Sequence, residues 1–259
     1  MTSGNPSPAS GTTSPVVIRG YDPSDRAAIR AICRQAASEQ PDPLFHEDLE
    51  LAPLLFADYY LDHEPDQCFV AEVEGRVVGY IATCKNTEDY FRVLRRRILP
   101  RLALRLLWKV ISLQFRNRSS YKALWWKLVT GLGPHQRDEL TLPISEYPAH
   151  SHRNVEPAYR GKGIGHSLSV RQHDHLREQG IRGIHAVLVE RAGNDFLSRE
   201  LCRRRGFELV ATQPHAVLRK VTGRDYFLKL LVCDLEKEAR NAASAADLGS
   251  DIRSVDRKQ

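Results

Sequence analysis

Apolar residues recur along the chain with two periods, and each period predicts one kind of element. Short runs rich in Val, Ile, Leu and aromatic residues, bounded by polar residues and glycines, favour strands. The strands predicted in this way cover residues 16–21, 68–73, 77–84, 147–155, 184–189, 207–211 and 226–234. A glycine turn at residues 74–76 separates the second run from the third, so these two are expected to form a β-hairpin.

Helices are predicted where apolar residues recur every three or four positions. One begins near Asp22, a suitable N-cap, and others cover residues 54–61 and 196–205, the last ended by Gly206. Another begins at Ile164 and stops before Gly180. Its helical face is expected to carry Ile164, Leu168, Val170, His175 and Leu176.

The stretch from Val155 to Gly165 joins the fourth predicted strand to that helix. It has glycines at positions 161, 163 and 165, with Arg160 and Lys162 between and beside them. Several backbone N–H groups are therefore unobstructed where the positive end of the helix dipole lies, an arrangement that suits a phosphate or pyrophosphate. This stretch predicts a nucleotide-type ligand.

Two common phosphate-binding motifs do not fit these glycines. A P-loop needs Lys-Ser or Lys-Thr after its second glycine, and a dinucleotide fingerprint needs G-x-G-x-x-G. The spacing here is Gly161-x-Gly163-x-Gly165, which leaves Arg-x-x-Gly-x-Gly as the pattern. Alone, such a run also fits a solvated turn.

The surroundings of this turn resemble the GCN5-related N-acetyltransferase family, from about residue 16 to residue 235. The features that carry the resemblance are the strand end Val155-x-Pro157-x-Tyr159, the Arg-x-x-Gly-x-Gly turn, the strand and helix that follow, and Gly206-Phe207. The resemblance implies a mixed, mostly antiparallel α/β sheet flanked by helices, whose fourth and fifth strands separate to admit acetyl-CoA as co-substrate. The implied cofactor-binding residues are Val155, Arg160, Gly161, Lys162, Gly163, Ile164, Gly165 and Asn194.

The family's helix signature is incomplete in this chain. Counted back from Gly206-Phe207, the position of the tyrosine that commonly acts as general acid holds Cys202, and Leu201 precedes it. A thiol with a pKa of about 8.5 can protonate a leaving thiolate, so Cys202 is the candidate acid. The alternative is that Cys202 is a small buried apolar residue.

Two histidines on the strand that enters the glycine turn are candidate bases. His150 and His152 share one face of the strand, and an imidazole accepts a proton readily near neutral pH. His152 is the preferred candidate, with Glu146 and Glu190 as alternatives at strand ends. Histidines held by structural hydrogen bonds are the competing interpretation.

The net charge of +6 comes from one segment, residues 90–134, called the basic segment below. It contains eleven Lys and Arg and no Asp or Glu, so the rest of the chain sums to −5. Leucines and isoleucines recur there every four residues beside a stripe of arginines, which predicts a helix with Pro100 in its first turn. A second helix is expected from Ser119 or Ser120, carrying Leu124, Trp125 and Leu128, to residues 131–134. The segment could cover the amine site, dock an anionic partner, or pack on the body with solvated arginines.

The remaining composition is that of one globular domain, expected over residues 16–238. Residues 1–15, rich in Ser, Thr, Gly and Pro, are expected to be a disordered leader, and residues 239–259 a disordered tail. The five cysteines have no metal-ligand or paired spacing, which favours free thiols, a cytoplasmic location and no metal. No apolar run is long enough to predict a transmembrane helix.

Together these features predict an acetyltransferase that moves acetyl from acetyl-CoA directly to a primary amine in a ternary complex. A small molecule or a peptide could supply that amine. The missing tyrosine keeps a second hypothesis open, a non-catalytic acyl-CoA-binding or sensor module. A third is a basic adaptor for an anionic partner. The oligomeric state is not predicted.

Overall fold

The computed structural model describes residues 15–115, 117–132 and 141–241, and the side chains of these except residues 128–132. The predicted leader and most of the predicted tail lie outside the described residues, as does the end of the second helix of the basic segment. The strands are β1 Val17–Gly20, β2 Cys68–Val73, β3 Arg76–Cys84, β4 Ala149–Val155, β5 Gly183–Arg191, β6 Glu208–Pro214 and β7 Tyr226–Asp234.

The helices fall into three groups along the chain. The first group is α1 Arg26–Ser38, α2 Pro43–Glu47, α3 Leu51–Phe56 and α4 Asp58–His63. The second is α5 Thr87–Val93, a π-helical turn Leu94–Ile98, α6 Leu99–Ile111 and α7 Arg118–Leu132. The third is α8 Ile164–Glu178, α9 Phe196–Arg205 and α10 Ala216–Thr222, and residues 235–241 are also helical.

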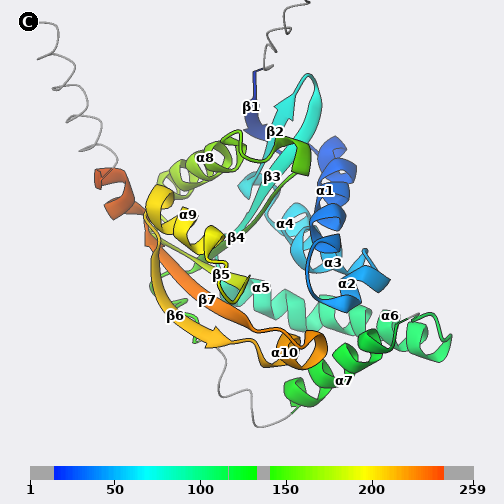
Figure 1. Cartoon of the computed structure of the whole chain (residues 1–259). Coiled ribbons are helices and arrows are strands. Elements are labelled where there is room, and N and C mark those ends of the chain that lie inside the picture. Colours follow the sequence, from blue (N-terminus) through cyan, green and yellow to red (C-terminus); the bar gives the residue numbers. More distant parts are fainter. Residues whose placement is uncertain (1–14, 116, 133–140, 242–259) are drawn as a thin grey trace, which may run out of the picture.

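The strands form one sheet in the order β1-β2-β3-β4-β5-β7-β6. Every neighbouring pair is antiparallel except β4 and β5, which are parallel. Helices α1 and α4 pack on one face of the sheet and α8 on the other, as Figure 1 shows. The predicted mixed, mostly antiparallel sheet flanked by helices is therefore confirmed.

Strand β2 is buried on both faces, and its alternating side chains enter two different cores. Cys68 and Val70 face the core under α1 and α4, whereas Phe69, Ala71 and Val73 face the core under α8. A strand covered on both faces reads as a continuous apolar run, which is how residues 68–73 appear in the sequence.

Glycines end two of the predicted helices. Gly180 follows α8 with a φ of 74°, and Gly206 ends α9 with a φ of 63°. Both angles lie in the left-handed region that glycine adopts without a Cβ penalty, so these two stop signals are confirmed. The face of α8 differs from the prediction at one position. Val170 is exposed, and Ser169, Gln172 and His173 are buried instead.

The described part of the basic segment is a nearly continuous helix, α5 to α6, followed by α7. Pro100 lies in the first turn of α6, as predicted, directly after the π-helical turn. The N–H of Leu99 bonds to the carbonyl of Leu94, and this wider turn precedes a proline that cannot donate its own bond. Leu102, Leu106 and Val110 pack inward against α2, α3 and α7, but Trp125, predicted to be part of the apolar face of α7, is exposed.

Helix α10 was not predicted. Its seven residues are too few to establish a helical period, and His215, which caps it through its side chain, is not a common N-cap residue. Within the described residues, no helix combines the length and the apolar character needed to cross a membrane.

A buried carboxylate fastens α6 to the body of the protein. Asp48, just before α3, accepts hydrogen bonds from Arg105 Nε at 2.6 Å and Arg105 Nη2 at 3.0 Å, and Lys109 Nζ lies 3.1 Å from it. Burial opposes ionisation of Asp48, but Arg105 and Lys109 outweigh it and hold the pKa of this carboxyl below its usual range. These two cations are therefore paired, contrary to the interpretation that the arginine stripe is only solvated.

We expect Asp48→Asn to reduce the free energy of unfolding by about 2 kcal/mol, because a charge-assisted bidentate contact is lost while Arg105 can still reach solvent. Asp89→Asn, which breaks only the exposed pair with Arg92, is the matched control and should cost about 0.3 kcal/mol. Urea unfolding measures both values.

The effect of Asp48→Asn should depend on pH. A depressed folded-state pKa stabilises the protein only when the carboxyl is ionised, so the difference from wild type should shrink as the pH falls below about 4. A difference that stays constant down to lower pH would contradict the ion pair.

Candidate active site

Two glycines of the turn adopt a left-handed backbone conformation. Gly161 and Gly163 have φ values of 78° and 81°, and an added Cβ at either would meet no atom within 4 Å. The need for glycine here is therefore conformational rather than steric. Gly163 is the N-cap of α8 and offers no side-chain cap.

The backbone N–H groups from Gly161 to Gly165 find no acceptor among the residues that the structure describes. The first intrahelical donors are His166 and Ser167, both of which bond to the carbonyl of Gly163. The unpaired N–H groups thus lie at the positive end of the α8 dipole, and this combination is typical of an anion-binding site.

The two basic side chains of the turn do not point their charges at these donors. Arg160 donates from Nε to the carbonyl of Val155 at 3.0 Å and pairs through Nη1 with Glu39 at 2.7 Å. Lys162 Nζ lies 4.9 Å from the ring centroid of Tyr159. Ile164 is buried under α8 and anchors the start of the helix. Of the residues predicted to bind the cofactor, residues 161–165 place their backbone N–H groups side by side in the turn. The side chain of Arg160 instead bonds to the last residue of β4, Val155.

An unpredicted arginine lies behind the turn. Arg153 of β4 donates from Nη1 to the carbonyl of Gly165 at 2.8 Å and to the hydroxyl of Ser169. It has no carboxylate partner among the described residues, and burial lowers its pKa from the usual value. An arginine keeps its charge under such a shift, so Arg153 adds positive potential directly beside the free N–H groups.

Strands β4 and β5 separate just before this turn. They pair only at Ala149 with Ile184 and at His150 with His185. Beyond these two pairs, β4 runs on to Val155 along β3 and β5 runs on to Arg191 along β7. The edge of β4 that faces β5 is therefore open from residue 151 to the glycine turn.

No family model matches the chain. Among solved structures, the chain is similar to one described as SsHAT, with 24% sequence identity and a TM-score of 0.59 over 85% of this chain and 98% of that one. A ribosomal-protein-alanine N-acetyltransferase from Brucella melitensis shows 20% identity and a TM-score of 0.49, over 84% and 99% of the two chains. A GCN5-related N-acetyltransferase from Kribbella flavida shows 18% and 0.49, over 85% and 97%.

The arrangement of the sheet agrees with this likeness. Its antiparallel strands β1 to β4, its separating parallel pair β4–β5 and its closing strand β7 between β5 and β6 form one continuous sheet. This chain has the GCN5-related N-acetyltransferase fold. Similarity at this level of identity concerns the fold, and the chemistry depends on the residues around the strand separation.

In this acetyltransferase fold, both histidines of β4 face the helices α3 to α5. His152 stacks on Phe56 with ring centroids 4.9 Å apart, and its Nδ1 lies 3.1 Å from the hydroxyl of Tyr80. Burial lowers the pKa of His152 to about 4. The ring is therefore neutral at physiological pH and has one nitrogen, Nε2, without a hydrogen bond to a described residue.

His150 is held more completely. Its Nδ1 lies 2.7 Å from Thr87 Oγ1, and its ring packs on Tyr90 and on His185. Burial, with the neighbouring His185 and His152, lowers the pKa of His150 to about 3. This histidine fits the structural interpretation.

Glu190 is not available as a base, although it ends a strand as predicted. It accepts the N–H groups of Leu197 at 2.7 Å and Ser198 at 3.1 Å, and Lys229 Nζ lies 2.9 Å from its other oxygen. Burial opposes ionisation, but the bonds from Ser198 and Lys229 hold the pKa of Glu190 below its usual value. This carboxylate caps the start of α9. Lys229 completes the cap, and no pattern in the sequence marked it as a site residue.

Cys202 and Asn194 lie at opposite ends of α9. Cys202 is half-buried beside the apolar cluster of Leu176, Ile184 and Phe207, and no hydrogen bond to a described residue holds it. Asn194 is exposed in the turn before α9, and its Oδ1 accepts the N–H of Phe196 at 3.3 Å. The roles of Cys202 as an acid and of Asn194 as a cofactor contact remain predictions.

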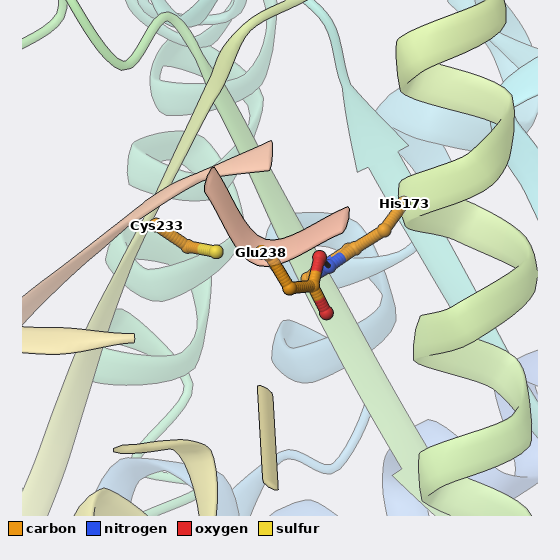
Figure 2. A group of neighbouring side chains, drawn as sticks. All are labelled: His173, Cys233 and Glu238. Atoms are coloured by element: carbon orange, nitrogen blue, oxygen red, sulfur yellow. Dashed lines mark hydrogen bonds and ion pairs between the residues drawn. The ribbon is translucent and has the colours of Figure 1, made fainter. Parts of the chain in front are cut away.

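One group of side chains has the residue types of a metal site. His173, Cys233 and Glu238 offer donor atoms within 4.8 Å of one another, and Figure 2 shows His173 directed toward Glu238. However, Arg205 Nη2 lies 2.9 Å from one oxygen of Glu238 and Arg177 Nη1 lies 3.4 Å from the other. Two guanidinium groups would repel a cation here, so the group is better described as an ion-pair network that ties residue 238 to α8 and α9.

Proposed function

We propose that this chain transfers acetyl from acetyl-CoA to a primary amine. The observation that carries the proposal is the row of unpaired backbone N–H groups from Gly161 to Gly165, next to the open edge of β4. Free donors at a helix start suit the pyrophosphate of CoA, and the open edge suits the amide groups of its pantetheine arm. Arg153 adds charge behind the turn, and Asn194 is the proposed polar contact from the α9 side.

The protein's part in this reaction is to hold the thioester and the amine together and to move protons. Acetyl-CoA supplies the activated acyl group. As the amine nitrogen bonds to the carbonyl carbon and the C–S bond breaks, one proton must leave the nitrogen and one must reach the thiolate. Direct transfer in a ternary complex needs no covalent enzyme intermediate.

His152 is the proposed proton acceptor. It lies on the open part of β4, it is neutral at physiological pH, and Tyr80 and Phe56 fix its ring. A low pKa makes it a weak base, so it suits an amine that loses its proton only as the new bond forms.

Loss of CoA binding in Gly163→Ala tests the cofactor site. An alanine at a φ of 81° costs about 1 kcal/mol, and relief of that strain moves the N–H groups of the turn. We expect CoA affinity, measured by calorimetry, to fall about tenfold, with thiol release falling in parallel. Gly223→Ala is the matched control, because Gly223 has a φ of 71° and equal free space but caps α10. Equal loss of affinity in both variants would overturn the proposed site.

The pH dependence of kcat/KM tests His152. Protonation of His152 should add a loss of activity as the pH falls through about 4, beyond the loss caused by protonation of the acceptor amine. His152→Gln should lack this additional step and be slower by about a hundredfold, whereas His175→Gln on α8 should keep the wild-type profile. An unchanged acidic limb in His152→Gln would exclude the histidine.

Cys202 is the proposed donor of a proton to the leaving thiolate. Cys202→Ala should then reduce kcat about tenfold with little change in CoA affinity or in the unfolding midpoint. Turnover equal to wild type would remove Cys202 from the mechanism.

A second candidate function, binding of acyl-CoA without turnover, is favoured by the apolar surroundings of Cys202. The two functions differ in a screen of small amines, polyamines and peptide N-termini that detects released thiol. CoA binding without thiol release from any acceptor would support the binding module.

A further inference from the structure

Helix α6 has a second apolar face, opposite to the one that packs on the protein. Leu104, Leu107, Trp108 and Ile111 recur at i, i+3, i+4 and i+7, and their side chains are between 54% and 68% exposed. This spacing places them in one stripe along the helix. The inward residues of α6 are different ones, so this stripe, called the outer stripe below, has no partner within the described chain.

A further exposed apolar residue follows the helix. Leu113 is 80% exposed and adopts a φ of 52°, a conformation that is unfavourable for a residue with a Cβ. A glycine would end α6 without this cost and without presenting an apolar side chain to solvent. An exposed leucine thus occupies a position where a glycine or a small polar residue would be expected.

The basic segment, which carries the outer stripe, contains Lys and Arg and no Asp or Glu. Six exposed cations of the basic segment have no carboxylate partner among the described residues, namely Arg95, Arg96, Arg97, Arg101, Arg118 and Lys122. The pairs that do form in this region use Arg92, Arg105, Lys109 and Lys127. Arg96, Arg97 and Arg101 immediately precede the stripe in sequence.

We propose that the outer stripe of α6 docks on a membrane surface that contains anionic lipid. Trp, Leu and Ile enter the boundary between headgroups and acyl chains, and the unpaired arginines contact lipid phosphates. The 13 residues of α6 span about 20 Å, less than the roughly 30 Å hydrocarbon core, so the helix lies along the surface and does not cross it.

Other occupants fit these observations less well. A second copy of the chain, paired through the same face, would bring unpaired arginines against each other. A nucleic acid would use the cations but would leave the aliphatic stripe in water. An anionic lipid surface satisfies both the apolar side chains and the charges.

The surface lies at a distance from the proposed cofactor site. Figure 1 shows α6 and α7 at one end of the molecule and α8, with the glycine turn at its start, at the other. Docking through α6 would therefore leave the turn accessible, and the proposal does not depend on the proposed acetyltransfer.

Co-sedimentation of the full chain with vesicles tests the proposal. We expect binding to phosphatidylcholine vesicles that contain phosphatidylglycerol, weak binding to phosphatidylcholine alone, and loss of binding at high salt. Leu107→Gln with Trp108→Gln should weaken binding about tenfold or more, and Arg96→Gln with Arg101→Gln about 30-fold.

The matched control is Leu209→Gln with Val210→Gln, which removes two apolar side chains that are about half exposed from the edge strand β6. This variant should bind vesicles as wild type does. Unfolding midpoints equal to that of wild type establish that every variant is folded.

Three outcomes would overturn the proposal. They are equal binding to both kinds of vesicle, vesicle binding that survives the Leu107 and Trp108 changes, and no vesicle binding at all. In the last case, a dimer abolished by the same changes in analytical ultracentrifugation would identify a second copy as the occupant. Salt-dependent binding to duplex DNA or RNA, again without vesicle binding, would identify a nucleic acid.

Discussion

The separation of β4 from β5 is the constraint on which the rest of the structure depends. A strand that leaves its neighbour exposes backbone donors and acceptors that must be satisfied by water or a ligand. Here the separation begins after two residue pairs, and the open edge of β4 leads directly into a turn whose N–H groups are also unpaired. The two β4–β5 pairs join the halves of the sheet, while β3 holds residues 150–155 of β4 and β7 holds residues 183–191 of β5.

Buried ion pairs secure the elements around this opening. Glu190 and Lys229 fix the start of α9 on the β5 side, and Glu238 joins α8 to α9 through Arg205. Burial opposes ionisation of both carboxyls, but hydrogen bonds from Ser198 and Lys229 lower the pKa of Glu190, and His173 with Arg205 lowers that of Glu238. Breaking one partner would leave an uncompensated charge in a poorly solvated place, so these pairs specify how the helices meet the sheet. Glu190 and Glu238 therefore hold the structure together and are not free to act as bases.

Helix α6, the 13-residue helix of the basic segment, has two different apolar faces. Its inner face packs with α2 and α7 in a small apolar core. Ion pairs of Asp48 with Arg105 and Lys109 hold the helix in place. Its outer face keeps apolar side chains and unpaired cations at the surface. A helix that is apolar on two faces is expected to have two partners, and the described part of the chain supplies one.

The sequence by itself determined the elements whose cause is local. Local preferences account for the apolar runs within residues 68–84, the helix stops at Gly180 and Gly206, and the position of Pro100. Together with the resemblance of the glycine turn, they sufficed to predict the fold.

Tertiary structure alone decided which side chains meet. Arg153 reaches Gly165, Tyr80 reaches His152, and Lys229 reaches Glu190 because the sheet brings residues together that are 12, 72 and 39 positions apart in sequence. The spacing of apolar residues in the sequence does not predict such contacts, because they depend on strand register and on burial. For the same reason the sequence could not tell that Arg105 and Lys109 are paired, or that Trp108 and Trp125 face solvent. The burial of a side chain is a property of the whole fold.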